Sequence, residues 1–460
     1  MLPLTLVDRL FVWLIFGHYL VYELVFFFYP EFLGGILVPL VAAWKLGFPV
    51  VLFFYGYVAR WTVVRKLRLP VAGYVLAFAL FLLWAAIPSL LSPYGIASFY
   101  EWLKLWPRAL FFLGLLGFVL SKPRALILLM KIMVCWAVCC VIQYFMLVIL
   151  RGYQSMHYYP GIPLEFAGTY GLLGNIASLM HFSGLPFPVV RLCGFWNEPS
   201  NASASLFVGF FFSRYLWLTE MRKGWRYASY FAFLGGMLCL SNAGYLAFAL
   251  ALAVGVSIST DWKLVSSLRR TLYLGVGVAL IAVALFGRKY VTERMPESDW
   301  ARAVVGARVE ASDTDEMNYD GGRLKLASNI FQDISDRPLG MGVPPFSEES
   351  QNISGTAPLY WFYATGFVGC FLLLTREAAA AFQVYQSSRR SDIMLAAAQA
   401  WVVVMVQQSV YGSWMNPLYF ITVVVLLANV NGGPAGDLDV ATIGGPASGG
   451  QPGCSLPLAQ

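Results

Sequence analysis

Residues 191–201, Arg-Leu-Cys-Gly-Phe-Trp-Asn-Glu-Pro-Ser-Asn, combine side chains that could bind an anion such as a phosphate. They lead directly into an apolar run, and Pro199 suits the first turn of a helix. A helix N-terminus attracts anions through its free N–H groups and its dipole, and the Arg191 guanidinium matches phosphate oxygens. Taken alone, the stretch favours a plainer interpretation, in which Glu198 caps the helix and pairs with Arg191.

Two later stretches place an arginine beside glycines. The first is Gly321-Gly322-Arg323. Because the two glycines have no side chains, the backbone beside Arg323 can approach a ligand closely. Arg337 lies in residues 336–342, Asp-Arg-Pro-Leu-Gly-Met-Gly, which has the composition of a turn. The alternatives are a flexible turn in which Arg323 pairs with a nearby acid, and a purely structural turn around Arg337.

Ionisable residues inside apolar runs are functional candidates, because they are costly in a membrane. His18 and Glu23 lie in the first run, and Lys131, near the start of another, can extend its amine to the surface. For His18 an interhelical hydrogen bond is favoured over a proton relay. His157 and His181 could act as acid–base groups. No zinc, haem or nucleotide motif is present, so no metal and no cofactor is expected.

The elements that must position these residues are membrane helices. Hydrophobic residues form 59% of the 460-residue chain and charged residues 12%, whereas soluble domains contain about 25% charged residues. Apolar runs of ~15–25 residues alternate with short polar connections, as a ~30 Å hydrocarbon core requires of helices. The net charge of +7 comes from basic clusters in those connections. The positive-inside rule explains them, and a nucleic-acid partner is not expected.

We therefore predict an all-α polytopic helix bundle over residues 1–430, with about twelve spans and both termini in the cytoplasm. Residues 151–199 and 288–356 form external loops, and the second holds half of the 24 acidic residues and so constitutes a subdomain. Within it, Leu326, Ile330 and Ile334 predict an amphipathic helix on the membrane or capping the bundle. Residues 431–460 form a disordered cytoplasmic tail. The first span has no following cleavage site and should be retained. The expected spans are 10–29, 33–64 (kinked or partly re-entrant), 71–91, 105–120, 126–150, 200–219, 227–241, 244–260, 271–287, 357–375, 392–411 and 414–430.

The order of the motifs resembles one known family. An Arg-x-x-Gly-(few)-Glu-Pro-Ser/Asn stretch enters a helix at residues 191–201, and a Ser-x-x-Gly turn follows at 241–244. A Gly-Arg pair lies in a large loop at 322–323, and a Pro-Leu-Gly-x-Gly motif follows at 338–342. A later span then begins at 365–369 with a small residue followed by Gly-x-x-Gly. Over residues 70–430 the chain resembles the O-antigen polymerase and O-antigen ligase family of integral membrane glycan transferases, which implies a GT-C-like fold.

The resemblance implies a metal-independent glycosyltransferase of the bacterial inner membrane. Its substrates would be glycans on undecaprenyl diphosphate at the periplasmic face, and a chain-length regulator or flippase would be a partner. Arg191 and Arg323 match the family's catalytic arginines and would stabilise the charge of the departing diphosphate. Glu198 would orient Arg191 or serve as base. Arg337, Asn197 and Gly322 would bind substrate.

One departure separates the two activities of the family. Ligases typically carry His-Asn about eleven residues before the glycine of the last motif, and here Gly355-Thr356 occupies that place. The gap favours a polymerase of repeat units, for O-antigen or another exopolysaccharide, over a ligase that transfers glycan to lipid A-core, and leaves the general base unassigned. Twelve spans also suit a transporter or flippase of envelope polysaccharide, although no repeated half is evident. A noncatalytic envelope scaffold is a further alternative.

Overall fold

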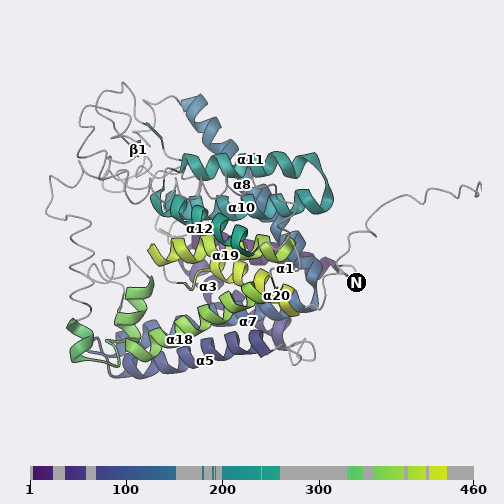
Figure 1. The fold of residues 1–460 in the computed structure, drawn as a ribbon. Coiled ribbons are helices and arrows are strands. Elements are labelled where there is room, and N and C mark those ends of the chain that lie inside the picture. Colours follow the sequence, from purple (N-terminus) through teal and green to yellow (C-terminus); the bar gives the residue numbers. More distant parts are fainter. Residues whose placement is uncertain are drawn as a thin grey trace, which may run out of the picture.

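The computed structural model is a bundle of helices (Figure 1). It describes residues 4–23, 37–58, 69–151, 179–180, 189–190, 192, 199–239, 241–258, 330, 332–345, 357–387, 392–410 and 414–431. The long helices are α1 (Leu6–Glu23), α3 (Leu37–Phe53), α5 (Leu69–Leu90), α7 (Leu105–Ser121), α8 (Pro123–Arg151), α10 (Pro199–Glu220), α11 (Lys223–Leu238), α12 (Asn242–Ile258), α18 (Ala357–Ser387), α19 (Asp392–Val410) and α20 (Pro417–Asn431). The other elements are a π-helical turn η2 (Phe54–Val58), the short α6 (Ile96–Leu103) and one antiparallel pair, β1 (Leu179–Met180) with β2 (Val189–Val190).

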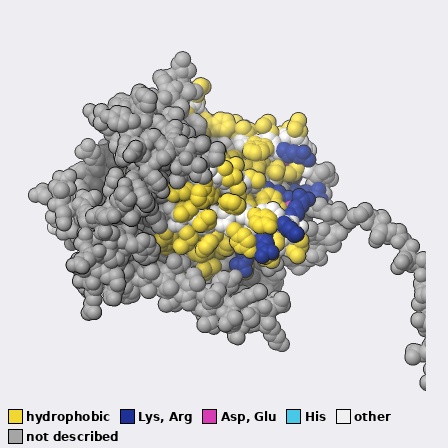
Figure 2. Space-filling model, turned by 90° about the horizontal axis from the view of Figure 1, so that it is seen from above, with side chains coloured by type: hydrophobic (Ala, Val, Ile, Leu, Met, Phe, Trp, Pro, Cys, Tyr) yellow, Lys and Arg dark blue, Asp and Glu magenta, His cyan; other side chains and the backbone are white. Residues whose placement is uncertain are grey.

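The helices have the character of a membrane protein. Five segments of the described chain are long and apolar enough to cross a bilayer: Pro39–Val58, Val71–Leu90, Ile96–Ser121, Pro123–Phe145 and Ala357–Val384. Their outward faces are apolar, and on α5 the side chains of Leu76, Leu80 and Leu83 are 59%, 45% and 58% exposed. Figure 2 shows another face of the bundle, seen from above, where hydrophobic side chains also form a broad surface. A surface of this size suits hydrocarbon and not water.

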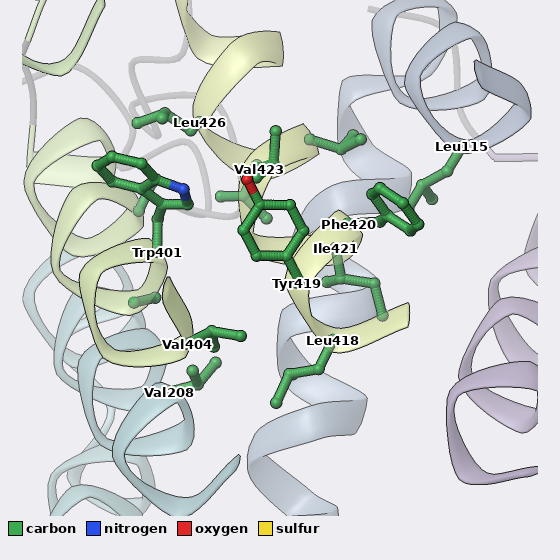
Figure 3. Packing of buried hydrophobic residues seen from close by; sticks show 14 of the residues in the cluster. Leu115, Val208, Trp401, Val404, Leu418, Tyr419, Phe420, Ile421, Val423 and Leu426 are labelled. Carbon is green, nitrogen blue, oxygen red and sulfur yellow. The ribbon is translucent and has the colours of Figure 1, made fainter. Parts of the chain in front are cut away.

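The core of the bundle surrounds α20, which packs against α7, α18 and α19. Figure 3 shows Tyr419, Phe420 and Leu418 of α20 between Leu115 of α7 and Val404 of α19, and all five side chains are buried. Small residues allow other helices to approach closely. A Cβ on Gly114 of α7 would lie 2.6 Å from a backbone carbon of α3. In a membrane the lipid is as apolar as the helix surface, so no hydrophobic effect draws helices together. Close packing of this kind drives their association instead.

One end of the bundle gathers basic side chains, and we call it the basic end (Figure 2). It contains the α7–α8 and α10–α11 junctions and the first turn of α1. Lys122 at the first junction lies 3.2 Å from the Asp8 carboxylate of α1, and Lys131 of α8 pairs with Glu220 at the end of α10. Burial would raise the pKa of Asp8, but hydrogen bonds from Thr5, Tyr55 and Lys122 outweigh it and hold the pKa well below its ordinary value.

Most of the expected spans coincide with described helices. The expected spans 71–91, 105–120 and 200–219 correspond to α5, α7 and α10 with small shifts at their ends. The expected span 33–64 is described over 37–58, as a helix containing Pro49 that ends in the π-helical turn. The span 271–287, most of the loops 151–199 and 288–356, and the tail 432–460 lie outside the described residues. A count of twelve crossings stays a prediction.

The expected end of the span 357–375 was wrong. Helix α18 continues to Ser387, and its apolar segment reaches Val384. The expected span stopped at Arg376-Glu377, because two charges usually mark the end of a membrane run. These two side chains are instead buried within the bundle.

Candidate functional site

The end opposite the basic end contains the connections before α6, before α18 and between α11 and α12, and we call it the loop end. Two of the sequence motifs contact each other there. The loop 338–342 lies against residues 363–366 of α18, with the Met341 N–H donating to the Tyr363 carbonyl at 2.9 Å. The Gly342 N–H donates to the Ala364 carbonyl at 3.0 Å. Segments about 25 residues apart in the chain thus form one backbone-paired unit.

Gly366 makes this pairing possible by interrupting α18. Its φ of 63° and ψ of −163° are non-helical and belong to a region that is essentially restricted to glycine. The break frees carbonyls of the preceding turn from helical hydrogen bonds, and the loop supplies the missing donors. A Cβ on Gly366 would lie 2.6 Å from the carbonyl carbon of Leu339, so a larger residue would push the loop away.

Side chains from α5 and the connection after it hold the same unit from the other side. The Trp84 indole N–H donates to the Thr365 carbonyl at 2.9 Å, and the Ser92 hydroxyl donates to the Met341 carbonyl at 2.6 Å. The hydroxyls of Tyr94 and Tyr363 lie 2.6 Å apart. These contacts fix the unit against α5 and the connection that follows it.

Arg337 is the one predicted site residue whose side chain is described. It is exposed, and it directly follows a helical segment at residues 332–336. Ile330 and Ile334 are each 1% exposed and pack against Phe362 and Tyr363 of α18. The predicted amphipathic helix is confirmed over this described part, and it caps the bundle. Arg337 thus projects from a cap that is anchored on the loop end.

A second polar cluster at the loop end surrounds the first turn of α10. The Gln407 side-chain amide of α19 donates to Asn201 Oδ1 at 2.6 Å. A Cβ on Gly244 would contact the Ser203 side chain, so the start of α12 lies directly against α10. The Leu192 N–H donates to the Leu238 carbonyl at 2.9 Å. The segments flanking 193–198 are therefore both fixed at this end.

The remaining predicted site residues lie outside the described part of the chain. The backbone and side chains of Arg191, Asn197, Gly322 and Arg323 are not described, and the same holds for Glu198. The histidines expected to be external, His157 and His181, and the pair at 355–356 also lie outside the described residues. Their roles stay predictions. The structure describes only the chain neighbours of residues 191–198.

A buried ion pair was missed by the sequence reasoning. Arg376 is 0% exposed, and its Nε donates to Glu377 Oε1 at 2.7 Å. The Tyr419 hydroxyl donates to the other carboxylate oxygen of Glu377. A guanidinium N–H of Arg376 donates to the Trp414 carbonyl at 3.4 Å. The network ties α18 to the start of α20. Adjacent opposite charges between Leu-Leu-Leu-Thr and Ala-Ala-Ala-Ala were the signal that could have revealed it.

The two ionisable candidates that can be tested behave differently. Lys131 is paired with Glu220, so it has a structural partner. His18 is 1% exposed, and its Nδ1 has no hydrogen-bond partner among the described residues. This nitrogen atom does not make the favoured interhelical hydrogen bond to a described residue, and for the His18 side chain as a whole that bond stays a prediction.

Chemically, the described part of the loop end offers amide, hydroxyl and guanidinium groups. Within the described ranges there is no group of three or more His, Cys, Asp or Glu side chains that could hold a metal ion.

Comparison with known proteins finds no family model that matches the chain. No curated protein matches it either. The site is therefore argued from its residues alone.

Proposed function

We propose that this protein is a membrane-embedded glycosyltransferase that polymerises oligosaccharide repeat units carried on undecaprenyl diphosphate. The ordered motif set carries the proposal. The contact between two members of that set, residues 338–342 and 365–366, supports treating them as parts of one site. The second cluster adds support, because Asn201 and the turn at 241–244 come from two further members.

The proposed orientation follows from the distribution of charge. Lys122, Lys131 and Arg222 lie at the basic end, and basic connections favour the cytoplasm. We place the basic end there, both termini with it, and the loop end in the periplasm of a bacterial inner membrane. With about twelve crossings, all five sequence motifs belong to the periplasmic half.

In the proposed reaction, the hydroxyl of one lipid-linked glycan attacks the anomeric carbon of another. The new glycosidic C–O bond forms as the bond to the diphosphate breaks, and the hydroxyl proton passes to a base. Arg191 and Arg323 stabilise the negative charge that grows on the leaving diphosphate, while Glu198 orients Arg191 or takes the proton. Arg337, Asn197 and Gly322 help to hold the glycan and its diphosphate.

The absence of His-Asn at 355–356 supports a polymerase over a ligase. Deletion of the gene, followed by gel analysis of surface and lipid-linked glycans, tests this choice. The proposal expects the long-chain ladder to disappear while single repeat units remain. Long polymer left on undecaprenyl diphosphate would instead identify a ligase. An unchanged set of exported glycans would overturn the transferase assignment and favour a transporter.

Complementation of the deletion strain locates the chemistry. Arg191→Ala and Arg323→Ala should each fail to restore the ladder although the protein is present in the membrane. Lys223→Ala, which removes a cation at the basic end, is the matched control and should restore it. Restoration by both arginine variants would contradict the proposed mechanism.

A further inference from the structure

The ring of Tyr22 in α1 has three basic side chains around it. The Lys45 amine of α3 lies 5.0 Å from the ring centroid, and the Arg108 guanidinium carbon of α7 lies 6.0 Å from it. The His18 ring lies 5.1 Å away in an edge-on arrangement. We call these four residues the Tyr22 cluster. Three helices thus bring two cations and an imidazole to one aromatic ring.

The Tyr22 cluster belongs to the loop end of the bundle. Arg108 lies in the first turn of α7, whose last residue adjoins Lys122 at the basic end. Tyr22 lies in the last turn of α1, whose first turn carries Asp8, the ion-pair partner of Lys122. The cluster is therefore at the same end as the two motif contacts, although none of its residues belongs to a motif.

The positive charge in the cluster is not neutralised by the described carboxylates. Every ion pair formed by described side chains involves other residues, and none includes Lys45 or Arg108. The two cations lie close enough to repel each other. Beside them, the buried His18 Nδ1 has no hydrogen-bond partner among the described residues. Two half-buried cations and an unpartnered buried nitrogen point to an anionic ligand.

We propose that the Tyr22 cluster binds the diphosphate group of a polyprenyl lipid. Arg108 offers a planar pair of donors and Lys45 a compact charge, and a neutral His18 that carries its proton on Nδ1 offers a further donor. This inference rests on the proposed function, to which it adds a site for the carrier lipid outside the sequence motifs. It gives the headgroup of the donor or the acceptor a place beside the reacting sugars.

The surroundings of Lys45 favour a lipid over a soluble anion. Lys45 lies inside the apolar segment Pro39–Val58. On the same helix Leu40, Leu46 and Val50 are 57%, 52% and 38% exposed. Lys45 itself lies on the opposite face of α3, which also carries the buried Val41 and Phe48, so an anion reaches it from within the bundle. The apolar outer face of α3 accommodates the chain of a polyprenyl lipid whose headgroup enters between the helices, whereas a free diphosphate makes no use of that face.

Native mass spectrometry of the full-length protein in detergent tests the site with three probes. These are undecaprenyl diphosphate, undecaprenol and inorganic diphosphate. The wild type should bind the lipid diphosphate much more tightly than the other two. Lys45→Met and Arg108→Met should each weaken binding about tenfold, as expected when a charge-assisted hydrogen bond is lost, and together about a hundredfold. Lys45→Arg, which keeps the charge, should retain most of the affinity.

Lys104→Met is the matched control, because Lys104 lies near Arg108 but forms an exposed pair with Glu101 at 2.6 Å. It should bind the lipid diphosphate as the wild type does. Unchanged binding by the Lys45 and Arg108 variants, or equal binding of undecaprenol, would overturn the inference. Equal affinity for inorganic diphosphate would assign the site to a soluble anion and overturn the lipid assignment. The assay contains no sugar, so its outcome is independent of the polymerisation test.

Discussion

The two ends of the bundle are built in different ways. At the basic end, helices are joined by side-chain ion pairs, such as Asp8 with Lys122 and Lys131 with Glu220. At the loop end, the loop 338–342 is joined to α18 by backbone hydrogen bonds and close glycine contacts. Lys104 and Glu101 form an exposed ion pair there, whereas Arg337, Lys45 and Arg108 form no ion pair with a described carboxylate.

If the proposed function is correct, this difference separates a structural end from a functional one. Where ion pairs hold the helices, the charges are satisfied by the fold and have little capacity for a ligand. Where backbone contacts hold the helices, cationic side chains remain available for an anionic substrate. The comparison predicts that substitutions of charge at the loop end alter binding and activity, whereas those at the basic end alter stability.

The largest loss of stability is expected within the bundle, where α18 connects the two ends. Arg376→Met would leave Glu377 buried without its cation, and we expect the free energy of unfolding to fall by about 3–5 kcal/mol. Unfolding of the protein in mixed micelles measures this, with Thr375→Ala on the exposed face as control. A fall of less than about 1 kcal/mol would show that the pair is not needed for stability.

Gly366→Ala should have the next largest effect and should act at the loop end. The substitution forces a non-glycine residue into a glycine-only conformation and against the Leu339 backbone, so a loss of about 3 kcal/mol is expected. Gly73→Ala in the neighbouring α5 meets no atom within 4 Å and should change stability by about 1 kcal/mol or less. Equal thermal stability of the two variants would contradict the proposed backbone contact.

Asp8→Asn tests the ion pairs of the basic end and should cost about 1–2 kcal/mol near neutral pH. The folded-state pKa of Asp8 is lowered, so its stabilisation is complete above the ordinary value of 3.8. It is lost as the pH falls towards the folded-state pKa. The wild type and variant should therefore converge in thermal stability in acid. A difference that is independent of pH would refute the ionic origin of this contact.

Loss of an exposed pair should have the smallest effect. Lys104→Ala removes the contact with Glu101 and should lower the free energy of unfolding by about 0.2–0.5 kcal/mol. The same unfolding measurement applies. A loss above about 1 kcal/mol would mean that surface charges at the loop end contribute to the fold as those at the basic end do.

The sequence predicted the helices better than their contacts. Expected spans such as 71–91 and 105–120 nearly coincide with α5 and α7, because the length of an apolar run is a local property. The end of α18 was misplaced because Arg376 and Glu377 neutralise each other through a tertiary contact with Tyr419. A charge that is paired inside the bundle looks the same in sequence as one at a membrane boundary.

The candidate site was predicted only in part for a similar reason. The motifs at 338–342 and 365–369 were recognised, but their contact depends on how the chain returns to the bundle after the loop. The Tyr22 cluster combines residues from α1, α3 and α7. Lys45 lies inside the expected span 33–64 and was not recognised as a site residue, since its neighbours are distant in the chain.

Reconstituted polymerisation tests the central claim most directly. The purified protein in liposomes receives a single undecaprenyl-diphosphate-linked repeat unit, and products are separated by gel. We expect a ladder from the wild type and from Lys223→Ala, and no ladder from Arg191→Ala or Arg323→Ala. No ladder from an intact wild-type protein, or ladders from both arginine variants, would contradict a glycan polymerase that acts through the loop end.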